Sequence, residues 1–179
     1  MNVTPATVRD QREWIHERAD VIVPLINRVR DDLGDQFGTE VDHVTVDAYR
    51  REVDAVFADG DLAVNVAALV GLLRSLDVTA DYPGFVVDEL LGRELAATIA
   101  GDQPLRVLGE ATFHFADATT HDGPAGGGDD GDDAATGDGA GADDLDAALA
   151  AGFQTRLPGW EWRERESPFG VAPGDCGQG

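Results

Sequence analysis

Apolar residues recur every three or four positions through the first part of the chain, which is the spacing of one helix face. Between Ile15 and Leu33 they follow in steps of four, three, four, three and four, which makes a heptad seam. Thr4 and Pro5 are typical of a helix start. Pro24 lies inside this segment and should kink the helix or divide it, because proline lacks a backbone donor. The seam should pack on its own chain or on a partner helix.

Three more helices are expected, over residues 45–59, 62–76 and 85–100, each with apolar residues on one face. Asp61 should cap the middle one, and Gly101 should end the last one. Because the helix at 62–76 is apolar almost all round, we expect it to be the central, buried helix of a bundle.

Residues 103–120 fit two interpretations. Gln103 and Pro104 could open a fifth helix, whereas the alternation of Val107, Phe113 and Phe115 is typical of a strand. A strand here would have no clear partner except residues 41–46. We therefore favour the helix and keep minor β structure at 105–116 as the alternative.

The remainder of the chain differs in composition. Residues 121–143 are almost entirely Gly, Asp and Ala, which predicts a disordered acidic linker. Leu145 to Ala151 should form a short helix, capped by Asp144 and ended by Gly152. The pattern as a whole predicts a mainly α protein. It has a small bundle of four to five helices over 4–120, the linker over 121–143, and a segment over 144–179 with one short helix and a tail.

The charge is extreme and one-sided. The chain has 35 acidic residues against 13 basic ones, all of them Arg, for a net charge of −22. This lysine-free, acidic composition resembles that of proteins from salt-accumulating halophiles, above all haloarchaea. At about 1 M salt the Debye length is only about 3 Å, so crowded carboxylates hardly repel each other. The resemblance implies a habitat rather than an activity, and it predicts that residues 1–121 loosen when salt is lowered.

Charge and motifs also narrow the classes of function. Nucleic acid is an unlikely partner because phosphate contacts need basic residues, although molar salt weakens this argument. We expect no membrane partner, and the N-terminus lacks the pattern of a secretory signal, which favours a cytoplasmic protein. Phosphate-binding glycine motifs and nucleophile elbows do not occur in the sequence, so we expect no cofactor. Cys176 is the single cysteine, which leaves no internal disulfide.

Histidines and carboxylates offer weak candidates for a metal site. If residues 104–121 are helical, His114, Asp117 and His121 share one face, and imidazole with carboxylate ligands at this spacing could hold Zn²⁺ or another divalent ion. Solvent-exposed histidines are the simpler interpretation. Two Glu-x-x-His pairs, at residues 13–16 and 40–43, resemble half of a di-metal bundle site, but chance pairing in a Glu-rich chain explains them better.

The aromatic tail is the strongest candidate for interaction. Trp160, Trp162, Arg163 and Phe169 follow the Gly/Asp-rich segment, and Trp and Arg are favoured interface anchors. The tail could equally fold back over its own helical core.

The leading hypothesis is a non-catalytic interaction or regulatory protein of a halophile cytoplasm. It would bind another protein or itself, through the helical seam or the tail. A metal-dependent enzyme is the alternative. A helical DNA-binding regulator that uses the Arg residues of the first helix is a minor third possibility.

Overall fold

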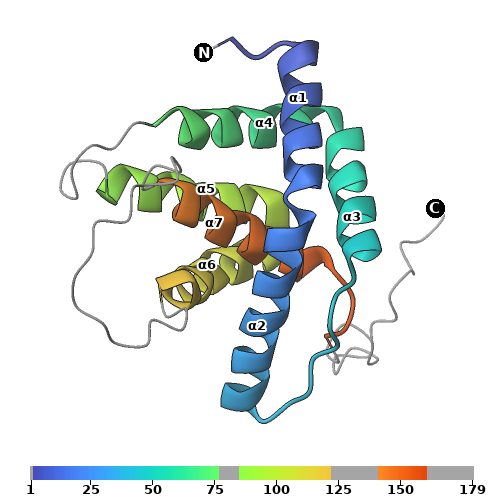
Figure 1. The fold of residues 1–179 in the computed structure, drawn as a ribbon, viewed down its shortest axis with the longest axis vertical. Coiled ribbons are helices and arrows are strands. Elements are labelled where there is room, and N and C mark those ends of the chain that lie inside the picture. Colours follow the sequence, from blue (N-terminus) through green and yellow to red (C-terminus); the bar gives the residue numbers. More distant parts are fainter. Residues whose placement is uncertain (1, 77–84, 122–140, 161–179) are drawn as a thin grey trace, which may run out of the picture.

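Seven helices and no strands make up the part of the chain that the computed structural model describes, residues 2–76, 85–121 and 141–160 (Figure 1). The mainly α prediction is confirmed. The helices are α1 (Pro5–Glu17), α2 (Ala19–Phe37), α3 (Val46–Ala58), α4 (Gly60–Ser75), α5 (Phe85–Ala100), α6 (Leu105–His121) and α7 (Gly141–Arg156). Their buried apolar side chains, from Ile15 to Trp160, form one contiguous core. The segment expected to be a linker lies outside the described residues over 122–140.

The strand considered at 105–116 is wrong, because these residues belong to α6. Gly109, Thr112, Phe113 and Ala116 are buried, at the three- and four-residue spacing of a helix face. In a strand, Val107 would share a face with Phe113, but Val107 is 55% exposed. The apparent alternation was therefore produced by an exposed valine.

The sequence predicted that Pro24 would kink the long first helix or divide it. The helix is divided in two, but the division lies before Pro24. α1 ends and α2 begins around Arg18, whereas Pro24 lies inside α2. Arg18 bonds to Asp146 of α7 at this junction, so the division lies where the chain reaches the core helix. The seam residues are all buried within the chain: Ile15, Ala19, Ile22, Ile26, Val29 and Leu33. The seam packs intramolecularly.

α4 is not the central helix that its composition predicted. It lies at the edge of the molecule beside α5, and its outer side exposes Val64 by 45% and Leu72 by 39% (Figure 1). Its cap also differs from the prediction. Asp59 rather than Asp61 accepts a hydrogen bond from the Leu62 amide, at 3.3 Å. The chain turns sharply there, because Asp59 both ends α3 and begins α4.

α7 is the central helix instead. It crosses the middle of the molecule and packs on α2, α5 and α6 (Figure 1). All its residues from 145 to 155 are buried. It is longer than the predicted helix and continues through Gly152, which brings α7 close to α5. A Cβ at Gly152 would lie 2.7 Å from Cβ of Ile99. Gly152 is therefore a close-packing residue and not a helix end.

Three arginines attach α7 to the N-terminal helices. Arg18 binds Asp146, and Arg156 Nε lies 2.5 Å from Glu52 Oε1 of α3. Arg30 of α2 is fully buried. Its guanidinium donates to the carbonyls of residues 154, 157 and 158, and to that of Asp42, at 2.6–3.2 Å. The Gln154 carbonyl belongs to the last turn of α7 and those of residues 157 and 158 directly follow it, so Arg30 caps the negative end of the helix dipole.

Within the described residues, no single helix has both the length and the apolar content of a membrane span. α3 and α4 together meet that measure, but they join at a bend of 110°.

Candidate functional site

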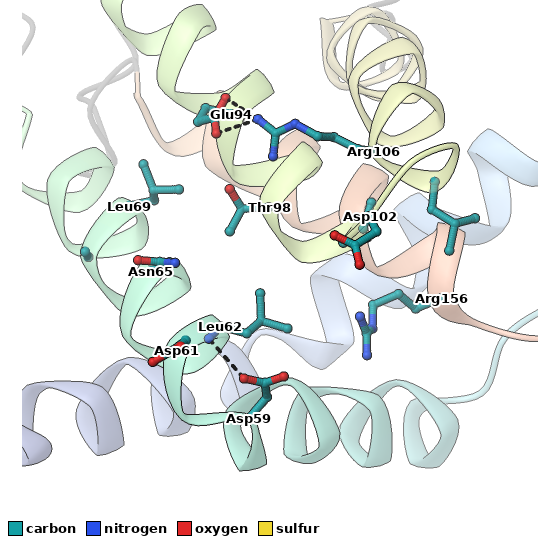
Figure 2. A pocket seen from close by; sticks show the side chains of 14 residues that line it. Asp59, Asp61, Leu62, Asn65, Leu69, Glu94, Thr98, Asp102, Arg106 and Arg156 are labelled. Atoms are coloured by element: carbon teal, nitrogen blue, oxygen red, sulfur yellow. Dashed lines mark hydrogen bonds and ion pairs between the residues drawn. The ribbon is translucent and has the colours of Figure 1, made fainter. Parts of the chain in front are cut away.

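An open cleft of about 1000 Å³ lies where α4, α5, α6 and α7 approach one another (Figure 2). α4 forms one wall, the second half of α5 forms the other, and the beginning of α6 and the end of α7 close one end. The lining residues are Asp59, Asp61, Leu62, Asn65, Ala68, Leu69, Glu94, Thr98, Ala100, Gly101, Asp102, Leu105, Arg106 and Arg156.

Two chain reversals bring these segments together. Asp59 turns the chain from α3 into α4 and holds the first turn of α4 at the cleft. Gly101 ends α5 with a φ of +95°, in the left-handed region that favours glycine. This reversal carries Asp102 and Arg106 back toward the same opening (Figure 2).

Both arginines of the cleft are engaged by the protein itself. Arg106 Nη2 lies 2.7 and 2.8 Å from the two carboxylate oxygens of Glu94, and this hydrogen bonding raises the pKa of Arg106 (Figure 2). Arg156 pairs with Glu52, and its Nη1 donates to the Ile99 carbonyl at 3.2 Å. The guanidinium groups therefore shape the cleft and partly balance its carboxylates.

The lining of the cleft is polar at its carboxylates, amide and arginines and apolar at its leucines. The described residues that line the cleft include no His, Cys or Ser. The side chain of Thr98 supplies a hydroxyl group to the lining. Such a surface can accept hydrogen bonds and contact apolar groups through Leu62 and Leu69.

The apolar outer face of α4 begins at the wall of this cleft. Val64, Ala68 and Leu72 follow one another at four-residue spacing, and Ala68 also lines the cleft. On α5, Leu90 is 49% exposed and precedes the cleft residues Glu94 and Thr98 on the same four-residue row. We call Val64, Ala68 and Leu72 the α4 face.

The metal site considered at His114, Asp117 and His121 stays a prediction, because α6 carries all three residues but the side chain of His121 is not described. His114 is about half exposed, and its Nδ1 lies 3.8 Å from a carboxylate oxygen of Glu89 on α5. Asp117 lies on the same helix, and the side chain of His121 lies outside the described residues. The described residues contain no group of three or more His, Cys, Asp or Glu side chains placed to hold a metal ion.

The histidines of the two Glu-x-x-His pairs form separate ion pairs with aspartates of neighbouring helices. His16 Nε2 lies 2.8 Å from Asp54 Oδ1 of α3, and His43 Nε2 lies 2.8 Å from Asp31 Oδ1 of α2. Neither pair faces the core.

Of the four predicted tail anchors, the structure describes Trp160 alone. Trp160 is 8% exposed; its indole N–H donates to the Gln154 carbonyl at 3.3 Å, and its ring stacks against the Arg30 guanidinium at 5.5 Å. Trp160 thus follows the alternative in which the tail folds back on its own core. Trp162, Arg163 and Phe169 lie outside the described residues.

Three arginines of the first two helices support the fold, whereas Arg9 and Arg28 are exposed. Arg12 binds Asp54, with Nη2 and Oδ1 2.5 Å apart, while Arg18 binds Asp146 and Arg30 is buried. No basic stripe of the kind that phosphate contacts require is formed by these three residues.

The described residues form an all-helical fold with an open cleft. The chain belongs to the family described as Domain of unknown function (DUF7984), whose model matches residues 1–173 and so includes all seven helices. No curated protein and no solved structure matches it.

Sequence reasoning missed the cleft and the exposure of the α4 face. The cleft unites Asp59, Glu94, Asp102 and Arg156, which come from separate segments and share no local motif. The α4 face did leave a signal. Leu62 to Leu73 is the longest run without a charged residue in a chain that is 27% charged.

Proposed function

We propose that this protein is a non-catalytic protein-interaction or regulatory protein of a salt-rich cytoplasm, and that it binds through the α4 face and the adjoining cleft. The observation that carries the proposal is the exposure of Val64 and Leu72 on an uncharged helix face of a protein with a net charge of −22. Apolar area that is exposed in a patch and rimmed by polar groups commonly marks an interaction site.

The binding surface is placed on α4 because the heptad seam and the described part of the tail are occupied by the protein itself. The heptad seam is buried in the core, and Trp160 packs on Arg30. The exposed face of α4 instead offers a continuous apolar row beside the polar cleft, and an exposed apolar helix face can dock in a hydrophobic groove of a partner.

The test is capture of partners by the immobilised full-length chain in concentrated potassium chloride. Three forms are compared: wild type, V64E/L72E, and the matched control V21E/V107E, which adds the same charge at two other exposed valines. Wild type and control should retain the same partner, and V64E/L72E should lose it. Equal retention by all three forms, or no retained protein, would contradict the proposal.

The metal-dependent enzyme and the DNA-binding regulator gain no specific support from the described residues, because these bring together neither a ligand cluster nor a basic surface.

A further inference from the structure

We draw no further inference here: the strongest candidate, the acidic cleft where α4, α5, α6 and α7 approach one another, belongs to the binding site already proposed, and nothing among the described residues that line it shows which ligand its exposed carboxylates would hold.

Discussion

α4 and α7 have the same length and are both largely apolar, yet one lies at the surface and the other fills the centre. The difference lies in side-chain size. α7 carries Ala at four buried positions and Gly152 at a fifth, so α2, α5 and α6 can pack around it on all sides. α4 carries Val and Leu around most of its circumference, and Val64 and Leu72 remain outside. An apolar helix becomes central when its neighbours can approach it closely, and apolar content alone does not decide its place.

The largest expected effect comes from removing the cap at the end of α7. Arg30→Ala should lower the free energy of unfolding by about 4 kcal/mol, because four carbonyls lose their bond to the buried guanidinium at once, although the Gln154 carbonyl keeps the Trp160 indole as a donor. Urea denaturation measures the loss. Arg28→Ala, on the exposed side of the same helix, removes the same charge and should cost under about 1 kcal/mol. Similar losses in the two variants would show that charge, and not the cap, stabilises the fold.

The same substitution in the two helices compares them directly. Leu149→Ala in α7 should cost about 3 kcal/mol, because Leu149 is fully buried and its removal leaves a cavity. Leu72→Ala in α4 should cost under about 1 kcal/mol in dilute protein, because Leu72 is partly solvated already. Thermal or urea unfolding of both variants gives the difference. If Leu72→Ala were the more damaging, α4 would be the central helix after all.

A smaller effect should follow from adding one methyl group at the contact of α7 with α5. Gly152→Ala places a Cβ 2.7 Å from Ile99 Cβ and 3.1 Å from the Ala96 carbonyl oxygen, and the resulting overpacking should cost about 2 kcal/mol. Gly60→Ala, in the first turn of α4, meets nothing within 4 Å and should be neutral or stabilising by up to about 1 kcal/mol. A stabilised Gly152→Ala would refute the close approach of the two helices.

The smallest effect concerns the exposed ion pair between α1 and α3. A hydrogen bond from Arg12 lowers the pKa of Asp54, whose side chain is 48% exposed. A lowered pKa means that the pair stabilises the fold above the ordinary Asp value of about 3.9 and ceases to do so as pH falls through the lower folded value. Asp54→Asn should therefore cost at most about 1 kcal/mol at neutral pH.

The measurement is the difference in unfolding free energy between wild type and Asp54→Asn from pH 7 downward. The difference should shrink below about pH 4. A difference that stays constant to pH 3 would show that the charge of Asp54 contributes nothing.

Local signals predicted the helices well where capping and periodicity act over a few residues. α3 begins at Thr45 as expected, where Thr45 is its cap, and Gly101 ends α5 as expected. The same logic failed at Asp61, because Asp59 lies at the sharper turn and takes the cap. It also failed at Gly152, where glycine serves a contact with Ile99 that no local pattern reveals.

The rest could not be predicted because it depends on residues far apart in the chain. In the sequence, Arg30 cannot be distinguished from the other arginines that lie among acidic residues. In the structure it is buried and donates to carbonyls more than 120 positions away along the chain. The cleft likewise needs Asp59, Glu94 and Arg156 from three distant segments. The uncharged run in α4 was visible in the sequence. Which of its residues are exposed could be known from the three-dimensional structure alone.

The place of α7 also constrains how the molecule is made. A ribosome completes the other six helices before α7, and the bond from Arg18 to Asp146 closes a loop of 128 residues. Until α7 arrives, the apolar sides of α2, α5 and α6 have no centre on which to pack. Such distant contacts slow folding because loop closure must precede the gain from packing. The last of the described helices to be translated is therefore the one that turns a nascent, loosely associated chain into the native state.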